Sequence, residues 1–324
     1  MSLIEKSEFV LYSSPTEGFL SYIPSPWIPY AELMRIHKPM GILYTYFPSL
    51  FGSLFAACLQ QPVPLPKTLV IVNIQLFAIA FTLRSVGCTW NDIVDRNLDC
   101  HVTRCSNRPM ARGALSLRAG YIFTAAQYLV LFTIVVSISQ SYLPYLAPVI
   151  VTGTFYPYAK RVTNYAQVVL GLSFSLSTLI GCAVMETDPL GLGLSRSSVG
   201  FLCLTASYIA WTVSFDTIYA FQDIQDDKKA GIKAMSIRHE GHMKPLLFGL
   251  SMVQVGLLIS TGLMIGAGWA YFSGIFCTAT LLMLMVWTVD LGSPRACWWW
   301  FKYGSLLIGG SLTLSLQGEY VRRL

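Results

Sequence analysis

Two clusters of acidic residues lie far apart in the sequence, and each closes a long apolar run. The first consists of Asn91, Asp92, Asp95 and Asp99, and the second of Asp216, Tyr219, Asp223 and Asp227. On a helix, Asn91, Asp95 and Asp99 would stack on one face, with Asp92 turned away by about 100°. Carboxylates held this close repel one another and need a cation to neutralise them. Hard oxygen ligands of this kind suit Mg²⁺, which is shared between a few carboxylates and the phosphates of a substrate.

The second cluster also falls on one helical face, at spacings i, i+3, i+7 and i+11. Asp226 leaves that face, so we expect it to be a bystander. A lone Asp at a helix end would be read as a solvated cap. Two clusters in helical phase instead predict one shared site for metal and diphosphate.

Basic residues occur in the same polar segments and are natural partners of phosphate oxygens. They are Arg35, Lys38, Arg104, Arg108, Arg112, Lys160, Arg161, Lys228 and Lys229. Topology anchoring or contact with lipid headgroups would explain each of them equally well. The sequence alone leaves both interpretations open.

Aromatic residues accompany the polar groups, among them Tyr156, Tyr158, Tyr219 and Phe221. Ring faces would stabilise a cation formed in an apolar pocket, each by roughly 0.5 to 2 kcal/mol. The run of Trp298, Trp299 and Trp300 at a predicted helix start is interpreted as an interfacial belt.

The composition places the chain in a membrane. Of 324 residues, 54% are hydrophobic and only 12% are charged, and the mean hydropathy is +0.56. The net charge of +6 is dispersed among short polar segments, so no nucleic-acid-binding face is expected. Most of the eight Cys lie in apolar runs, and Cys100, His101 and Cys105 lack the further ligands of a zinc site. We expect neither a disulfide framework nor zinc.

The elements that must position the clusters are membrane-spanning helices, since about 20 apolar residues suffice for one crossing. We predict an all-α bundle of about nine crossings, with eight as the alternative. They cover residues 40–60, 68–91, 119–139, 143–158, 165–186, 198–222, 245–267, 270–289 and 298–316. Residues 1–32 form an irregular, Pro-containing arm, with a short amphipathic helix near residues 30–37, and residues 33–324 form the transmembrane domain.

The distribution of Lys and Arg predicts the orientation. With the first helix starting in the cytosol, most basic residues fall on the cytosolic side, and both acidic clusters do as well. The first 32 residues show neither an Arg-rich presequence nor an early apolar signal core. We therefore expect a multi-pass protein of the endoplasmic reticulum or a related membrane with a cytosolic site, in preference to the mitochondrial inner membrane.

Four motifs resemble the UbiA superfamily of intramembrane prenyltransferases, and within it the 4-hydroxybenzoate polyprenyltransferase group. They are Asn91-Asp92-x-x-Asp95-x-x-x-Asp99, Asp216-x-x-Tyr219-Ala220-x-Gln222-Asp223-x-x-x-Asp227, Asn107-Arg108-Pro109 with Arg112-Gly113, and Tyr156-Pro157-x-x-Lys160-Arg161. The resemblance covers about residues 33–316. It implies a helical bundle with a central cavity, in which Mg²⁺ links the Asp motifs to an allylic diphosphate.

The resemblance also implies roles for individual residues. Metal ligands would be Asn91, Asp92, Asp95, Asp99, Asp223 and Asp227, and the catalytic set would be Asp95, Asp99, Asp223, Asp227 and Tyr219. Substrate-binding residues would be Arg35, Arg104, Arg108, Lys160, Arg161 and Lys228. The implied partners are a prenyl diphosphate and an aromatic acid acceptor within a lipid bilayer, and no obligate protein partner is evident.

The stretches 33–41 and 44–48 resemble the fungal branch of this group, which farnesylates polyketide-derived phenolic acids in meroterpenoid biosynthesis. The alternative within the family is a mitochondrial 4-hydroxybenzoate polyprenyltransferase of ubiquinone biosynthesis. Outside it, a membrane cation transporter or an intramembrane terpene cyclase would also place acidic residues in a bilayer.

Overall fold

The computed structural model of the protein describes residues 12–13, 15–138, 142–188, 191, 193 and 195–324. The first eleven residues of the predicted arm, residue 14 and the last residue of the predicted 119–139 crossing lie outside this range. The described residues form helices and no strands, which confirms the all-α prediction.

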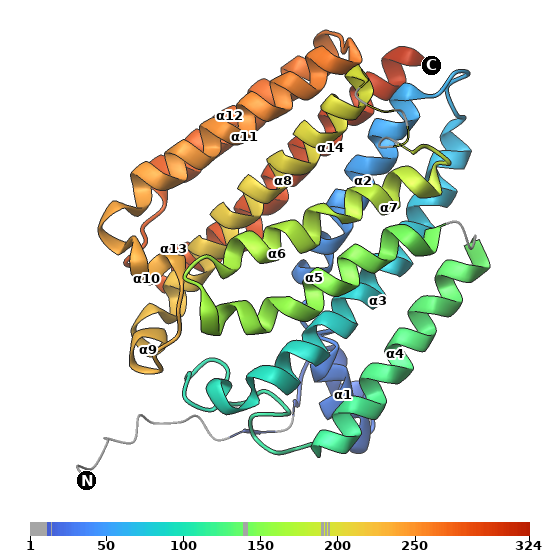
Figure 1. Cartoon of the computed structure of the whole chain (residues 1–324). Coiled ribbons are helices and arrows are strands. Elements are labelled where there is room, and N and C mark those ends of the chain that lie inside the picture. Colours follow the sequence, from blue (N-terminus) through green and yellow to red (C-terminus); the bar gives the residue numbers. More distant parts are fainter. Residues whose placement is uncertain (1–11, 14, 139–141, 189–190, 192, 194) are drawn as a thin grey trace.

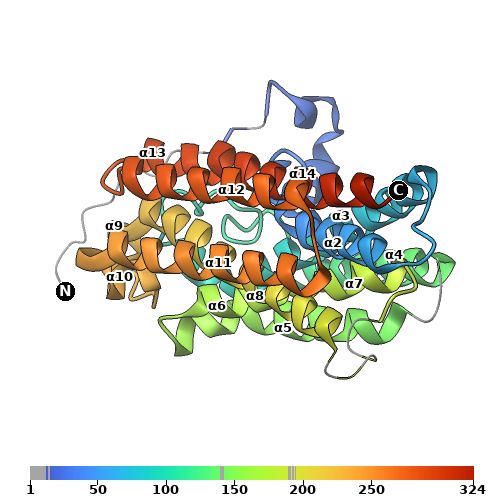
Figure 2. The same cartoon turned by 90° about the horizontal axis from the view of Figure 1, so that it is seen from above.

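Long helices run lengthwise through the bundle (Figure 1). They are α2 (Met40–Leu59), α3 (Pro66–Asp99), α4 (Leu117–Ile138), α5 (Leu143–Val162), α6 (Ala166–Ser175) followed by α7 (Ser177–Val184), α8 (Arg196–Ala220), α11 (Met243–Ile265), α12 (Trp269–Thr288) and α14 (Ser305–Arg323). Helices α12 and α14 lie along one side of the bundle, and α5 and α6 lie along the opposite side (Figure 2).

Shorter helices gather at the end of the bundle opposite to the C-terminus (Figure 1). They are α1 (Ile28–Leu33), α9 (Ile224–Lys229), α10 (Met235–Arg238) and α13 (Pro294–Trp299). The polar segment between α3 and α4 lies at the same end. This end therefore carries both acidic clusters.

Each of the nine predicted crossings has a helical counterpart. Within the described part of the chain, seven helical spans are long and apolar enough to cross a membrane. The counterparts at α5 and α14 do not reach that apolarity, since α5 contains three Pro and three Tyr and ends in Lys160 and Arg161, and α14 carries Glu319, Arg322 and Arg323.

Three predicted crossings differ in extent from the observed helices. Helix α3 continues eight residues beyond residue 91 and carries the whole first cluster, as its helical spacing predicts. The 165–186 crossing is divided at Leu176 into α6 and α7. The 298–316 crossing begins as α13, passes through a π-helical segment at Trp300–Gly304 and then continues as α14 to Arg323. The boundary predicted between residues 32 and 33 falls inside α1.

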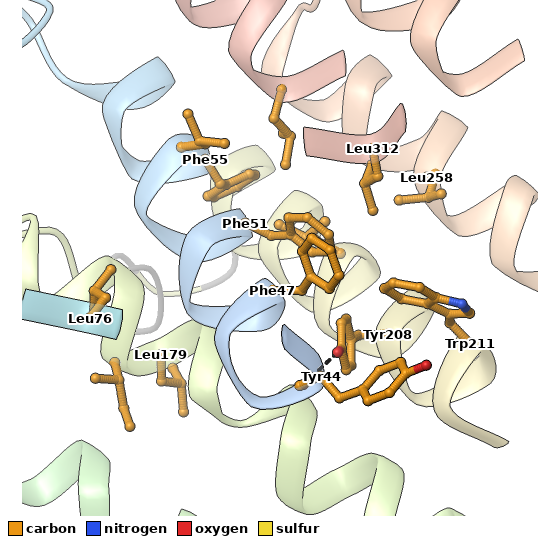
Figure 3. Packing of buried hydrophobic residues seen from close by; sticks show 14 of the residues in the cluster. Tyr44, Phe47, Phe51, Phe55, Leu76, Leu179, Tyr208, Trp211, Leu258 and Leu312 are labelled. Carbon is orange, nitrogen blue, oxygen red and sulfur yellow. Dashed lines mark hydrogen bonds between the residues drawn. The ribbon is translucent and has the colours of Figure 1, made fainter. Parts of the chain in front are cut away.

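The interior is packed by aromatic residues of α2 and α8. Phe47 and Phe51 of α2 face Trp211 of α8, with ring centroids 5.8 and 6.4 Å apart. The hydroxyl of Tyr208 donates to the carbonyl oxygen of Tyr44 at 2.6 Å (Figure 3). Because Tyr44 and Tyr208 are almost fully buried, this bond satisfies polar groups that would otherwise be unpaired.

Close contact between α2 and α7 depends on two glycines. A Cβ atom at Gly52 would collide with the carbonyl oxygen of Thr178, and one at Gly181 would collide with that of Ser49. Small residues of this kind allow helix backbones to approach within membranes.

We expect Gly181→Ala to destabilise the protein by about 1–3 kcal/mol, because the added methyl group forces α2 and α7 apart. The measurement is the thermal unfolding midpoint of purified protein in detergent. Gly256→Ala in α11 is the matched control, since a Cβ there meets nothing within 4 Å. Equal midpoints for the two variants would contradict the close packing.

Candidate active site

A single cavity of about 560 Å³ brings the two acidic clusters together. Its lining includes Asn91, Asp92, Asp95 and Asp99 from α3, Asp216 and Tyr219 from α8, and Asp223 and Asp227 beyond it. Polar groups separated by more than a hundred positions in the sequence therefore share one compartment. The remaining lining is largely apolar and aromatic.

The carboxylate of Asp95 lies at the centre of the first cluster. Lys160, at the end of α5, donates from Nζ to Asp95 Oδ2 at 2.9 Å and to Asn91 Oδ1 at 3.2 Å. Arg161 donates to the carbonyl oxygen of Val94 and lies 3.6 Å from Asp95 Oδ1. These cations neutralise a carboxylate that is only 2% exposed, which allows the helix to continue past its apolar part.

Asp92 faces a different set of partners. Arg35 approaches its Oδ1 at 2.6 Å and Arg108 approaches it at 3.5 Å. Arg108 also pairs with Asp99 at 2.8 Å. The 100° offset predicted for Asp92 thus turns it toward α1 and the segment after α3, while Asn91 and Asp95 face α5.

The turn that carries Arg35 is held by a second buried ion pair. Arg35 adopts a left-handed backbone conformation, with φ 57°, immediately after α1. One turn earlier, Glu32 pairs with Arg112 at 2.6 Å and accepts a hydrogen bond from the hydroxyl of Tyr12 at 3.0 Å. The described part of the N-terminal arm is thus tied to the loop that carries Arg108.

The residues of the second cluster do not lie on one uninterrupted α-helix, although all four line the same cavity. Helix α8 ends at Ala220, a 3-10 turn covers Phe221–Asp223, and α9 follows. Arg104 fixes this turn by donating from Nε to Asp223 Oδ1 and Oδ2, at 2.9 and 2.8 Å, and from Nη1 to the Tyr219 hydroxyl at 2.5 Å. The structure nonetheless places Tyr219, Asp223 and Asp227 in the cavity lining.

Two predicted substrate-binding residues lie outside the cavity lining. Lys228 pairs with Glu240 at 2.6 Å, and Arg161 is 43% exposed beside Asp95. Asp226, the predicted bystander, accepts a hydrogen bond from the backbone of Thr103 and is not part of the lining. Trp298, interpreted as part of an interfacial belt, lines the cavity instead.

Arg84, a residue without a predicted role, lines the same cavity. It lies two turns before Asn91 on α3, and its Nε is buried and has no hydrogen-bond partner among the described residues. A Cβ atom at Gly41 would lie 2.6 Å from this nitrogen, so the guanidinium rests against the backbone of α2. An Arg within an apolar helix is itself the signal that could have revealed it.

The donor set of the cavity fits Mg²⁺. All six predicted ligands carry hard oxygen donors, and Asp92 Oδ2 and Asp95 Oδ1 are buried without a hydrogen-bond partner in the described structure. Among the described residues, no group of three His, Cys, Asp or Glu side chains is close enough together to hold a metal ion by itself. This arrangement suits an ion that takes a few ligands from each cluster and the others from substrate phosphate.

These observations define a multi-pass integral membrane protein with a polar, acid-lined cavity at one end of a helical bundle. Residues 45–307 match the UbiA prenyltransferase family, and the chain belongs to that family. The resemblance stated from the four motifs is thereby confirmed.

Relatives come from two groups. The chain is similar to prenyltransferase ascA of Acremonium egyptiacum, with 33% identity over 95% of this chain and 91% of the relative. It is equally similar to the mitochondrial 4-hydroxybenzoate polyprenyltransferase of Schizosaccharomyces pombe, with 34% identity over 91% of this chain and 81% of the relative.

Among solved structures, the fold is similar to a UbiA homolog from Aeropyrum pernix K1, with a TM-score of 0.68, 24% identity and coverage of 87% of this chain and 99% of that one. It is also similar to a UbiA homolog from Archaeoglobus fulgidus bound to GPP and Mg²⁺, with a TM-score of 0.60, 17% identity and coverage of 89% and 99%.

Proposed function

We propose that this protein is an Mg²⁺-dependent aromatic prenyltransferase, which transfers a prenyl group, expected to be farnesyl, from its diphosphate to a ring carbon of a phenolic acid. The observation that carries the proposal is the convergence of both acidic clusters with Arg104, Arg108 and Lys160 in one cavity that continues into an apolar lining. The names of relatives and the GPP and Mg²⁺ of the Archaeoglobus homolog support the same chemistry.

The chain's own residues supply binding and charge. Asn91, Asp92, Asp95, Asp99, Asp223 and Asp227 would hold Mg²⁺, which when bound neutralises the diphosphate and favours its departure. Arg35, Arg104, Arg108 and Lys160, now paired with the acids, would turn part of their hydrogen-bonding capacity to the phosphate oxygens.

Transfer then follows in three steps. The allylic C–O bond breaks with its electron pair on the diphosphate, the ring carbon attacks the allyl cation, and the ring loses a proton. Within the described lining, Asp216 is the carboxylate outside the predicted metal set, so it is placed to take that proton. Apolar walls limit capture of the cation by water.

The acceptor is expected to be an acid because Arg84 lines the cavity and its Nε has no hydrogen-bond partner among the described residues. Arg84 lies on α3 seven residues before Asn91, about 10 Å along the helix axis. A phenolic acid whose ring reaches the allylic carbon could place its carboxylate against this guanidinium.

The subgroup is proposed from the stretches 33–41 and 44–48, which favour a polyketide-derived acceptor and a meroterpenoid pathway. The proposed location is the endoplasmic reticulum, with the site on the cytosolic side, as the distribution of Lys and Arg suggests. The similarity to ascA and to stbC of Stachybotrys bisbyi, each 33% identical, supports this choice. The 34% identity to mitochondrial relatives keeps ubiquinone biosynthesis as the alternative. A transporter is disfavoured because Glu319, a buried acid at the opposite end of the bundle, is paired with Arg322 and Arg323 and is therefore not free to bind a passing cation.

The test uses microsomes that contain the protein, incubated with Mg²⁺, farnesyl diphosphate and a panel of 4-hydroxybenzoate and orsellinic-type acids, with products identified by mass spectrometry. We expect a farnesylated orsellinic-type acid that disappears with EDTA. Prenylation of 4-hydroxybenzoate alone, particularly by longer chains, would instead establish the ubiquinone function. A hydrocarbon or terpene alcohol without acceptor would indicate a cyclase.

Diphosphate binding should also depend on pH through Lys38, which lines the cavity. Its pKa is lowered to about 8, first by desolvation and then by the positive charges of Arg35, Arg104 and Arg108. Lys38 is therefore charged below pH 8 and neutral above it, so affinity for an anion should fall as the pH rises through 8. The affinity for a non-hydrolysable prenyl diphosphate analogue is expected to fall about fivefold between pH 7 and pH 9. In Lys38→Met the affinity should be lower at pH 7 and should change little with pH. If the affinities of the variant and the wild type fall in parallel as the pH rises, Lys38 is not the titrating group.

A further inference from the structure

The wall of the cavity next to Tyr219 is built by five aromatic rings, which we call the aromatic wall. They belong to Tyr44, Phe215, Tyr219, Trp298 and Phe301, and all five line the cavity. Phe301 lies at the centre, with its ring centroid 4.3 Å from that of Tyr219, 4.9 Å from that of Tyr44, 5.7 Å from that of Trp298 and 6.0 Å from that of Phe215.

Phe301 occupies this position because the last transmembrane segment contains a π-helical turn, Trp300–Gly304. The backbone N–H of Ser305 donates to the carbonyl of Trp300, five residues earlier, and not to that of Phe301 as in an α-helix. The carbonyl of Phe301, which loses this donor, accepts a hydrogen bond from the hydroxyl of Tyr44. Helix α2, whose Tyr44 is labelled in Figure 3, is thereby joined to the wide turn.

Gly304 permits this turn. A Cβ atom at position 304 would lie 2.8 Å from Cζ3 of the Trp300 indole, which packs across the glycine. An added Cβ would push the indole aside, and we expect this to disturb the widened turn.

The aromatic wall is continuous with the charged site. The Tyr219 hydroxyl accepts a hydrogen bond from Arg104 Nη1. The Arg104 guanidinium also lies 4.7 Å from the centroid of the Tyr219 ring and pairs with Asp223. A diphosphate held between the acidic clusters would therefore present its allylic carbons to the rings beside Tyr219. Ring faces attract a cation through their quadrupole, most strongly where water is excluded.

We propose that the π-helical turn places Phe301 against the allylic carbons, so that Phe301 with Tyr44 and Tyr219 stabilises the allyl cation during prenyl transfer. This assignment rests on the proposed function. It gives Phe301 a catalytic role in the ionisation step and Gly304 a positioning role.

The test compares purified wild-type protein with Phe301→Leu and Phe301→Tyr, using Mg²⁺, farnesyl diphosphate and the accepted phenolic acid. Phe301→Leu keeps an apolar side chain but removes the ring, so kcat should fall about tenfold, with an unchanged KM for the diphosphate. The share of farnesyl alcohol among the products should rise, because a less stabilised cation is captured less selectively. Phe301→Tyr retains the ring and should restore most of kcat.

Gly304→Ala should reproduce the kcat loss of Phe301→Leu without touching the ring, whereas Gly310→Ala, where a Cβ meets nothing within 4 Å, should behave as wild type. Equal kcat for Phe301→Leu and wild type, or equal losses in Phe301→Leu and Phe301→Tyr, would overturn the inference while prenyl transfer itself stands. A wild-type protein that neither ionises nor transfers farnesyl diphosphate would overturn the proposed function and this inference together.

Discussion

Asp95→Asn is expected to reduce prenyl transfer by about 10³-fold while leaving the protein folded. Asp95 is almost fully buried, its Oδ2 accepts from Lys160, and its Oδ1 has no hydrogen-bond partner in the described structure. Asn preserves the shape and one oxygen but removes the charge, so it weakens a metal ligand without emptying packed space. Asp223→Asn should have the same effect from the other cluster.

The measurement is the single-turnover rate of product formation as a function of Mg²⁺ concentration. If Asp95 binds the metal, Asp95→Asn should shift the Mg²⁺ requirement upward. Lys160→Met, which removes the partner of Asp95, should instead raise the KM for the diphosphate with little change in the Mg²⁺ requirement. If the Mg²⁺ requirement of Asp95→Asn is unchanged, Asp95 is not a metal ligand and serves only to pair with Lys160.

Asp226→Asn provides the matched control. Asp226 lies next to Asp227 and carries the same charge, but it accepts from the backbone of Thr103 outside the cavity lining. We expect nearly wild-type turnover. If Asp226→Asn loses as much turnover as Asp223→Asn, the negative charge of this region matters for turnover whether or not the residue lines the cavity. The distinction between the lining acids and Asp226 would then be wrong.

The spacing of the acids could predict that they converge, because side chains three or four residues apart share a face of an α-helix in a membrane as well as in water. Asn91, Asp95 and Asp99 were found on one face because α3 is regular through all three. The α-helix that carries the start of the second cluster was expected to continue, but the chain tightens into a 3-10 turn after Ala220, where Arg104 holds Asp223. That turn is held by a contact between segments far apart in the sequence, and helical periodicity does not predict such a contact.

Two other features lay beyond sequence reasoning for a similar reason. A run of three Trp residues at a helix start resembles an interfacial belt, and only the packing of Trp298 against Phe301 shows that it lines the cavity. The π-helical turn depends on the hydroxyl of Tyr44, which is more than 250 residues away. Arg84, in contrast, was visible as a charge within an apolar helix, but its partners could not be inferred.

The second large effect is expected at Arg84. Arg84→Met should lower kcat/KM for a phenolic acid acceptor by about 10²-fold, because it removes a charge-assisted, buried partner of the carboxylate. The same variant should act on the matching phenol without a carboxylate at close to the wild-type rate. Competition between acid and phenol, measured by mass spectrometry in one reaction, compares both substrates under identical conditions. Equal losses for the two acceptors would show that Arg84 supports the bundle and does not recognise the acid.

Gly41 offers an independent way to move Arg84 without removing its charge. The guanidinium lies against the backbone of α2 at Gly41, and a Cβ atom there would be 2.7 Å from Arg84 Cζ. Gly41→Ala must therefore displace the guanidinium, so it should reduce the preference for the acid over the phenol in the same direction as Arg84→Met, by a smaller factor. Gly41 lines the cavity, so the added methyl group could also crowd a substrate, but such crowding should slow the acid and the phenol alike, whereas displacement of Arg84 should slow the acid selectively. A preference for the acid that survives in Gly41→Ala but not in Arg84→Met would mean that the guanidinium reaches the carboxylate from more than one position.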